Sequence, residues 1–231
     1  MRKRKKILSC LMLVACLIPL SLSSFFLAPS RADEAQAPFT DSGTASWFGR
    51  WHHGKRTASG EPFDMYAMTA AHRTLPFGTV LQVTHLKTGR EILVRVNDRG
   101  PYRKRRILDL SYAAAECLGM RVSGVAQVEI KAVGDTDGLP LDANQAFFVR
   151  LDEERSNSRA ERKLAGLIRA GFPKAADLLY LAGDAVALGP FDSFQEAQET
   201  LLRVSTIHPK AAIMLAERDG VKPVVSTQAA N

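Results

Sequence analysis

The chain has 231 residues and a formal charge of +7, but that charge is concentrated at the N-terminus. Residues 1–32 contain six of the 31 Lys and Arg residues and no acid, so the remainder has 25 basic and 24 acidic side chains. A nearly neutral remainder argues against nucleic acid as a partner, because that class of protein carries its positive charge on the folded domain. The length allows one large or two small domains.

The first 32 residues have the pattern of a secretion signal. A basic segment at 2–6 precedes an apolar run at 7–28, and small residues surround a cleavage point at Ala32. Within the apolar run, residues 13–16 (LVAC) fit a lipobox, which would make Cys16 a lipidated N-terminus. Two outcomes stay open: soluble export after cleavage at Ala32, and a lipid anchor at Cys16. Both predict an exported protein of the periplasm or cell envelope that meets the membrane only through Cys16.

The cysteines are too few for a disulfide framework. Cys10 and Cys16 lie in the leader, so a chain cut at Ala32 keeps only Cys117 and cannot form an intramolecular disulfide. Cys117 falls within a predicted helix at 112–118, where we expect a buried and unreactive thiol.

After a short polar tether at 33–41, residues 42–134 have the pattern of a mainly β domain. Apolar side chains alternate with polar ones in four segments, and this period of two predicts strands. The predicted strands are 43–48, 79–84, 90–96 and 126–133, with a hairpin turn at 86–90. Ser111 can cap a short helix at 112–118, which Gly119 ends. Many short strands with one small helix predict a compact barrel.

Residues 135–141 form a Gly/Asp/Pro linker, and 142–220 have a different, α+β pattern. The predicted order is a strand at 147–151, a helix at 158–170, strands at 178–181 and 185–188, a helix at 194–204 capped by Ser193, and a strand at 211–215. This β-α-β-β-α-β order is typical of a ferredoxin-like fold, with helices on one face of an antiparallel sheet. We expect residues 221–231 to form a flexible tail.

Asp98 stands where the strand at 90–96 meets the turn imposed by Gly100 and Pro101. A carboxylate in that place is held by a rigid scaffold and stays reachable from solvent, which suits a catalytic group. The structural alternative is a turn in which Asp98 only accepts a backbone hydrogen bond.

Other functional classes find less support in the sequence. His52, His53 and His72 match no recurrent zinc spacing, so we expect no metal. A Gly-rich loop between strand and helix and a Gly-x-Ser-x-Gly elbow are both missing from the sequence, so we expect no cofactor and no hydrolase of that class. What remains is acid–base chemistry by carboxylates, such as proton delivery to a glycosidic oxygen. When the substrate's own hydroxyl attacks, one acid/base residue suffices, and Asp98 is the candidate.

Four motifs resemble the rare lipoprotein A (RlpA) family and occur in the family's order. They are 43–49 (GTASWFG), 60–64 (GEPFD), 68–76 (MTAAHRTLP) and 94–101 (VRVNDRGP). The resemblance implies that the first domain is a six-stranded double-psi β-barrel. It also implies a lytic transglycosylase, a lyase that cleaves peptidoglycan between N-acetylmuramic acid (MurNAc) and N-acetylglucosamine (GlcNAc). The expected products carry 1,6-anhydroMurNAc ends, and the expected substrates are glycan strands lacking stem peptides.

The resemblance also implies the site. The family's functional positions fall on Asp98, Glu61, His72 and Asp64, and all four residue types are kept. We expect His72 to bond Asp98 or the sugar, or else to have a structural hydrogen-bonding role. Six further residues in or near the motifs are expected to bind substrate: Thr57, Ser59, Thr69, Asn97, Arg99 and Trp47.

Residues 142–220 resemble a SPOR domain through 147–149 (FFV), 188–191 (LGPF) and the order of the elements. Arg150 and Asp152 stand where Gln and Gly are usual in that domain. The resemblance implies binding to glycan strands stripped of stem peptides, with septal division proteins as further partners. A second hypothesis stays open beside the enzyme: a non-catalytic peptidoglycan-binding protein of the cell wall or division site, which would use the barrel cleft as a sugar groove.

Overall fold

The computed structural model describes residues 38–103, 105–153, 166–167, 169, 179–182 and 185–223. The predicted leader with Cys16 and Ala32, most of the tether, most of the predicted helix at 158–170 and residues 224–231 lie outside these ranges. No helix in the described ranges is long and apolar enough to cross a membrane.

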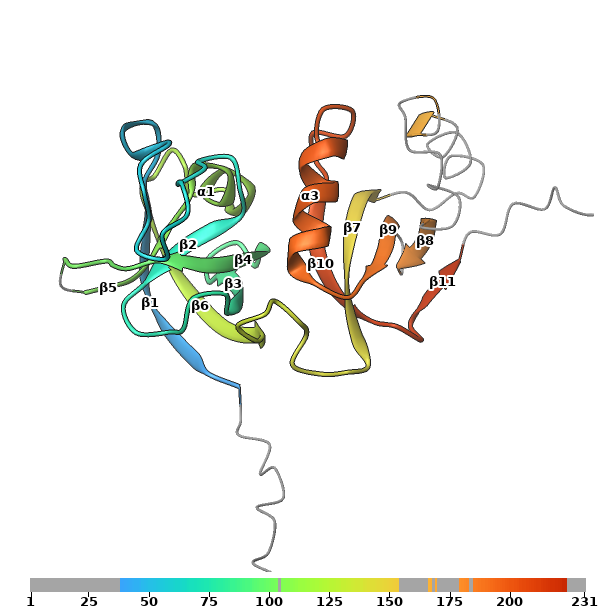
Figure 1. Ribbon diagram of the computed structural model, residues 1–231, viewed down its shortest axis with the longest axis horizontal. Coiled ribbons are helices and arrows are strands. Elements are labelled where there is room, and N and C mark those ends of the chain that lie inside the picture. The colour runs from blue at the N-terminus through green and yellow to red at the C-terminus, as the bar shows by residue number, and fades with distance from the viewer. Residues whose placement is uncertain are drawn as a thin grey trace, which may run out of the picture. The chain divides into compact units, whose positions relative to one another are not determined.

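The first sheet closes into a barrel (Figure 1). Its strands are β1 (Thr40–Trp47), β2 (Thr69–His72), β3 (Val80–His85), β4 (Glu91–Asp98), β5 (Arg106–Leu110) and β6 (Val125–Gly134). Neighbouring strands follow the order β1-β5-β2-β4-β3-β6, and β6 pairs with β1 to close the ring. The pairs β1–β5 and β2–β4 are parallel, and the other four pairs are antiparallel. The predicted barrel and its four predicted strands are confirmed.

Two of the six strands were not predicted. All four residues of β2 are buried, so this strand shows no alternation of apolar and polar side chains. The other strand, β5, begins at Arg106, the last residue of a basic run, so no change in composition marks where the strand begins. These two strands are neighbours in the barrel, and both carry residues of the site described below.

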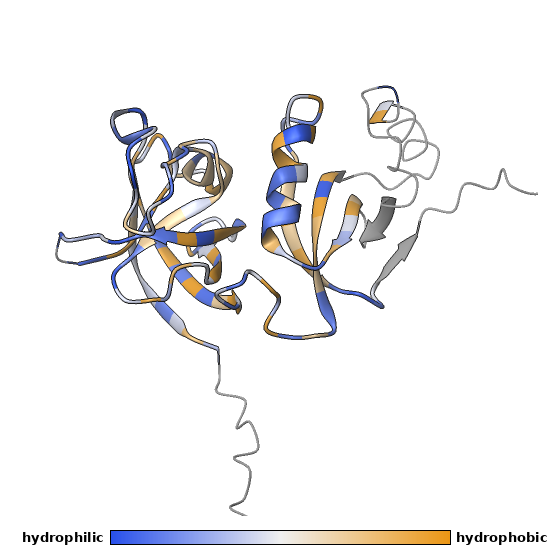
Figure 2. Cartoon of the chain, viewed as in Figure 1, coloured by the Kyte–Doolittle hydropathy of each residue, from blue (hydrophilic) through white to orange (hydrophobic). Residues whose placement is uncertain are grey.

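The barrel core is built from the inward positions of the strands. Val94 and Val96 of β4 are fully buried, as the alternation in that segment predicts. Figure 2 shows the same alternation along β6, where Val128 and Ile130 are buried and Glu129 is exposed. Burial of such side chains supplies the main driving force for closing the barrel.

One helix, α1 (Tyr112–Leu118), follows β5 and matches the predicted range. The hydroxyl of Ser111 accepts the Ala114 N–H at the helix start, and Gly119 ends the helix in the left-handed conformation at φ 80°. Both ends therefore follow the expected capping chemistry.

The expected burial of Cys117 in α1 is wrong, because this residue is exposed. Its position on the turn after the buried Ala114 and Ala115 places it on the outer side of the helix. Partial desolvation of the sulfur, together with the charge of Glu116, still raises the pKa of the Cys117 thiol. Little reactive thiolate is therefore present at neutral pH, in line with an unreactive cysteine.

The residues after β6 form a tight turn. The Asp135 N–H donates to Leu139 O at 2.9 Å, and the Leu141 N–H donates to Val133 O at 2.9 Å. The Asp135 carboxylate accepts the N–H groups of Asp137 and Leu139, both at 2.9 Å. The predicted Gly/Asp/Pro linker is thus an ordered turn at the end of β6.

The second sheet has five antiparallel strands in the order β10-β7-β9-β8-β11 (Figure 1). They are β7 (Gln145–Glu153), β8 (Leu179–Ala182), β9 (Ala185–Phe191), β10 (Ala212–Glu217) and β11 (Val221–Pro223). The helix α3 (Phe194–Val204), capped by Ser193, packs on this sheet, and the ring centroids of Phe194 and Phe147 are 5.7 Å apart. The four predicted strands and the predicted helix at 194–204 are confirmed.

The predicted flexible tail at 221–231 is wrong for its first three residues. Val221–Pro223 form β11, which pairs with β8 at the edge of the second sheet. This segment is too short to show a period, so alternation could not reveal it.

Candidate active site

Asp98 is the last residue of β4, and its half-buried carboxylate is fixed by two backbone donors. Its Oδ1 accepts the Ala58 N–H at 2.9 Å and the Arg99 N–H at 2.8 Å. The second of these is the local turn bond of the structural alternative, but Ala58 lies 40 residues away. Among the described residues nothing donates a hydrogen bond to Asp98 Oδ2. One carboxylate oxygen is therefore held in place while the other is available to a substrate.

Residues 54–63 form a loop that folds over this end of β4. The loop closes on itself through the Gly54 N–H to Phe63 O at 2.8 Å and the Thr57 N–H to Glu61 O at 2.9 Å. It is attached to β4 by the Ser59 N–H, which donates to Asn97 O at 3.2 Å, and by the Ala58 bond described above. The 54–63 loop thus brings two sequence motifs together around Asp98.

Two predicted substrate-binding residues, Thr57 and Ser59, shape this loop. The buried Thr57 hydroxyl donates to Glu61 O at 3.0 Å and lies 2.9 Å from the Ser59 hydroxyl. The Ser59 hydroxyl in turn donates to Glu61 Oε1 at 3.2 Å. The exposed hydroxyl of Ser59 is the one of the two that solvent can reach.

Glu61 forms an ion pair with Arg95 of β4, with 3.0 Å between Oε2 and Nη2. Burial raises the pKa of Glu61, but the hydrogen bond and charge of Arg95 and hydrogen bonds from Asn97 and Ser59 outweigh it and leave the pKa below its ordinary value. Glu61 is therefore an anion at neutral pH. In this state it can orient Arg95 and Asn97 or bind a sugar hydroxyl, but it has no proton to donate.

His72 ends β2 and is almost fully buried. Its Nδ1 accepts the N–H groups of Leu75 at 3.0 Å and Thr74 at 3.3 Å. Burial lowers the pKa of His72, and the charges of Arg99 and Arg73 add to this while Asp41 opposes it. The ring is therefore neutral with its proton on Nε2. Within the described chain no hydrogen bond joins His72 to Asp98. The two bonds to Nδ1 agree with the structural alternative, and the bond to a sugar stays a prediction.

Asp64 lies at the far end of the motif that contains Glu61. Its Oδ1 accepts the Tyr66 N–H at 2.9 Å, and its side chain is half exposed. His53 Nδ1 lies 3.8 Å from this carboxylate and accepts the Met65 N–H at 3.2 Å. Asp64 thus stabilises the turn that follows the 54–63 loop.

Two buried polar atoms, one on β4 and one on β2, lack partners among the described residues. Asn97 Oδ1 and Thr69 Oγ1 make no hydrogen bond to any described residue, although both side chains are almost inaccessible to solvent. Arg95 pairs with Thr69 across β2 and β4, and its buried Nε also lacks a hydrogen-bond partner among the described residues. Buried polar atoms are rarely left unpaired, so water or substrate groups are expected to satisfy these three.

The remaining predicted residues lie at the edges of the site. Arg99 stacks its guanidinium over the Phe77 ring, 3.6 Å from the centroid, and its Nη1 lies 3.5 Å from His72 O. Trp47, at the end of β1, packs edge-on against Tyr112 with ring centroids 5.7 Å apart. Trp47 is half-buried, so one part of its ring stays open to a ligand.

One carboxylate near Asp98 was missed. Asp109 of β5 pairs with Ala71 of β2, and Ala71 pairs in turn with Asp98 of β4. Because directly paired residues share a face of a sheet, Asp98 and Asp109 lie on the same face on either side of Ala71. The segment 106–110 was not predicted as a strand, so the sequence offered no register from which to place Asp109.

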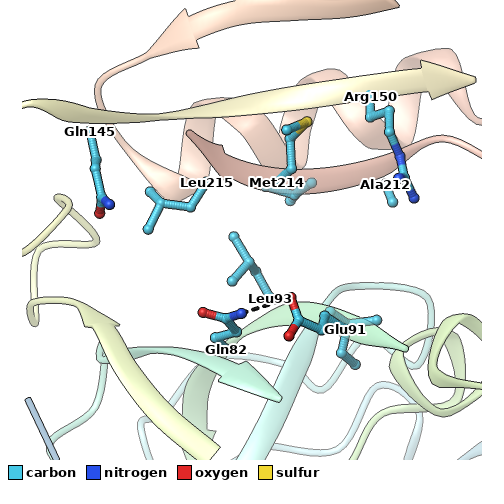
Figure 3. A pocket seen from close by; sticks show the side chains of 10 residues that line it. Gln82, Glu91, Leu93, Gln145, Arg150, Ala212, Met214 and Leu215 are labelled. Atoms are coloured by element: carbon cyan, nitrogen blue, oxygen red, sulfur yellow. Dashed lines mark hydrogen bonds between the residues drawn. The ribbon is translucent and has the colours of Figure 1, made fainter. Parts of the chain in front are cut away.

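Two further features of the described chain concern a pocket and the arrangement of metal-binding side chains. A pocket lined by Gln82, Glu91, Arg150, Met214 and others contains none of the candidate residues (Figure 3). In the described ranges, no group of three or more His, Cys, Asp or Glu side chains is arranged to hold a metal ion.

The comparisons with known proteins agree with this placement. A family described as "Lytic transglycolase" matches residues 40–130, which contain the whole site. The chain is 37% identical over 169 residues to the endolytic peptidoglycan transglycosylase RlpA of Neisseria meningitidis serogroup B, covering 71% of this chain and 70% of that protein. The chain belongs to the RlpA family. The barrel is accordingly the double-psi β-barrel that the motifs implied.

Other RlpA proteins match the barrel more closely but over a shorter stretch. The RlpA of Vibrio cholerae is 52% identical over 95 residues, which is 41% of this chain and 36% of that protein. The probable RlpA of Treponema pallidum is 56% identical over 88 residues, covering 38% of this chain and 28% of that protein. Among solved structures, a Clavibacter michiganensis expansin in complex with cellohexaose aligns with a TM-score of 0.36 and 22% identity, covering 51% of this chain and 59% of that one.

Proposed function

We propose that this RlpA-family protein is a lytic transglycosylase that cleaves the MurNAc–GlcNAc bond of peptidoglycan and leaves 1,6-anhydroMurNAc ends. The observation that carries the proposal is the Asp98 carboxylate. Its Oδ1 is fixed by two backbone N–H groups, and its Oδ2 is free among the described residues. Relatives named endolytic peptidoglycan transglycosylase support the same reaction class.

The proposed step needs one proton at the leaving oxygen. With Oδ1 accepting two N–H groups, the proton of a neutral Asp98 resides on Oδ2, from which it can pass to O4 of the leaving GlcNAc. The muramyl 6-hydroxyl attacks C1, so that the O6–C1 bond forms while the C1–O4 bond breaks. No water is consumed, in contrast to a hydrolase.

The other polar groups are proposed to bind the sugars. The unpaired atoms of Asn97, the neighbour of Asp98 in β4, and of Thr69, which pairs with Arg95, offer an acceptor and a hydroxyl, and the anionic Glu61 fixes Arg95. Ser59, Arg99 and Trp47 lie at the accessible edge and can contact neighbouring sugars. Hydrogen bonds of this kind position the substrate for the attack.

We propose that the second sheet is a SPOR domain that recruits glycan strands lacking stem peptides. Its strands β7, β8, β9 and β10 occur in the order β10-β7-β9-β8, which is the arrangement of a split βαβ unit with β11 added at one edge. The test compares binding of the full chain and of a chain ending at residue 141 to native and stem-peptide-stripped sacculi. Equal binding by both chains to stripped sacculi would remove this role.

The proposal includes export, with the mature protein in the periplasm either soluble or anchored through a lipidated Cys16. The basic and apolar pattern of residues 1–32 supports this location. Peptidoglycan would be the main partner there, and septal division proteins are proposed as further partners.

The deciding experiment incubates the exported protein with stem-peptide-stripped glycan and measures release of 1,6-anhydroMurNAc ends by mass spectrometry. We expect release by the parent and none by Asp98→Asn. If the parent binds glycan but releases no such ends, the proposed enzyme is wrong, and the non-catalytic peptidoglycan-binding protein is the better hypothesis.

A further inference from the structure

We infer that Asp109 is a second catalytic carboxylate of this site, which contacts the muramyl residue and accepts the proton of its 6-hydroxyl. The inference rests on the transglycosylase function proposed above and adds to it a residue that lies outside the four motifs.

The register of the barrel strands places Asp109 in one row with Asp98. Ser46 of β1 pairs with Asp109 of β5, Asp109 pairs with Ala71 of β2, and Ala71 pairs with Asp98 of β4. These four residues therefore form one row across four adjacent strands of the barrel. Neighbouring strands are about 4.8 Å apart, so the Cα atoms of Asp98 and Asp109 are separated by roughly 10 Å. Ala71 stands between them in the row, and the register of β2 with β4 shifts between Ala70 and Ala71.

The direction of Asp109 follows from its neighbours. Leu108 and Leu110 on the same strand are fully buried in the core, so the side chain of Asp109 points to the outer face. Its side chain is 17% exposed and is thus reachable by a ligand while still largely shielded from water. Shielding of this kind strengthens the interaction of a carboxylate with substrate groups.

The turn after Asp98 passes next to Asp109. A Cβ atom at Gly100 would lie 3.8 Å from Asp109 Oδ2 and 3.9 Å from the Ala71 methyl carbon. Gly100 also has φ +140°, a conformation that other residues rarely adopt. A glycine at this position therefore allows the turn and keeps Asp109 free of a covering side chain.

The Asp109 carboxylate is held by donors. Its Oδ1 accepts the hydroxyl of Ser46, the oxygen of Ser46 accepts from Arg106 Nη1, and Arg106 Nη2 lies 3.5 Å from Asp109 Oδ2. Because Ser46 and Arg106 both donate, Asp109 faces the site as a hydrogen-bond acceptor. Asp98 and Asp109 are thus supported differently, as a proton donor and a proton acceptor should be.

A purely structural explanation of these three residues is weak. Partly buried ion pairs contribute little net stability, because desolvation of the charges offsets their attraction. The outward position of a barrel strand could be filled by an uncharged residue without that cost. The charged group is better explained by a task that requires a carboxylate.

The two carboxyl groups complete the reaction without a further reagent. The proton on Asp98 passes to O4 as the C1–O4 bond breaks, and the proton of the 6-hydroxyl passes to Asp109 as the O6–C1 bond forms. Transfer of one proton from Asp109 to Asp98 through solvent restores the starting state. The net change is cleavage of one glycan strand into two pieces whose combined composition equals that of the strand, so no water is added and no electron is transferred.

The test is Asp109→Asn in the full exported chain, assayed on soluble glycan oligosaccharides that lack stem peptides. Asn keeps the shape and can still accept the Ser46 hydroxyl, but it cannot take up the proton. We expect kcat to fall by about 100-fold or more, with KM changed by less than about threefold. The matched control is Glu129→Gln, an exposed carboxylate on β6 that points away from the core, and it should turn over like the parent.

The outcomes are distinguishable. If the parent is active and a folded Asp109→Asn has the same kcat, the inference is overturned and the proposed function stands. The same holds if Asp109→Asn raises KM and leaves kcat unchanged. A parent that releases no anhydro ends overturns both. If circular dichroism shows that Asp109→Asn does not fold, Ser46→Ala decides instead: it keeps the carboxylate, and a kcat about tenfold below the parent supports the inference while an unchanged kcat overturns it.

Discussion

Replacement of Asp98 by Asn removes the carboxyl proton that the proposed step transfers and keeps the size and shape of the side chain. The side-chain oxygen of Asn can accept both N–H groups that now bind Asp98 Oδ1, at 2.8 and 2.9 Å, and the amide nitrogen takes the place of the free Oδ2. A hydrogen bond to a neutral acceptor contributes about 0.5–1.5 kcal/mol, and both bonds are kept, so we expect a loss of at most about 1 kcal/mol in unfolding free energy at this half-buried site. The barrel should stay folded.

The catalytic loss should be much larger. Removal of a general acid lowers the rate by about 10²–10⁴-fold, which corresponds to roughly 3–5 kcal/mol of transition-state stabilisation. The assay is release of 1,6-anhydroMurNAc ends from stripped glycan, with circular dichroism as the fold control and glycan affinity measured in parallel. A folded Asp98→Asn that turns over like the parent would refute the assignment.

A matched control exists in the same chain. The Asp135 carboxylate accepts two backbone N–H groups through one oxygen, both at 2.9 Å, in a turn that contains no candidate site residue. Asp135→Asn should therefore reproduce the small loss of stability without the loss of activity. Equal loss of activity in both variants would show that the assay reports folding and not chemistry.

Three further predictions concern stability and charge. Val94→Ala and Val96→Ala should each lower the unfolding free energy by about 1–3 kcal/mol in denaturant titrations, because both side chains are fully buried; unchanged midpoints would contradict the core assignment. Burial lowers the pKa of His72, so as the pH falls the unfolded chain takes up the proton before the folded chain does. The unfolding free energy should therefore be constant above about pH 6.5 with respect to His72 and should decrease below that pH. This decrease should be smaller in His72→Gln when denaturant titrations are compared across pH. Glu61→Gln should raise KM more than it lowers kcat, because Glu61 is ionised and anchors Arg95; the opposite split in steady-state kinetics would make it the proton donor.

The sequence reveals local structure well in this chain. The range of α1 and its capping by Ser111 depend on residues within one turn of the helix, as does the start of α3 at Ser193. The strand β6 has one face in the core and one outside, and in β4 the apolar Val94 and Val96 alternate with the polar Arg95 and Asn97. The period of both segments is therefore visible without any knowledge of their partners.

The closure of the barrel could not be predicted in the same way. Parallel pairing of β1 with β5 and of β2 with β4 joins segments that are far apart in the sequence, and neither β2 nor β5 shows a clear period. The row that places Asp109 beside Ala71 exists only after these pairings form. The contact of Ala58 with Asp98 has the same origin, since a loop about 40 residues upstream must fold over the strand end.

The choice of Asp98 as the proton donor depends on what each carboxylate of the four motifs is bound to. Glu61 has both oxygens engaged, Oε2 by Arg95 at 3.0 Å and Oε1 by Ser59 at 3.2 Å, and its pKa lies below the ordinary value. Asp64 is held in a turn by the Tyr66 N–H. Asp98 has one oxygen fixed and the other free of partners in the described part of the chain, which suits delivery of a proton in a defined direction. A folded Asp98→Asn that kept its activity would contradict this choice, and neither Glu61, paired with Arg95, nor Asp109, paired with Arg106, is placed to give the proton instead.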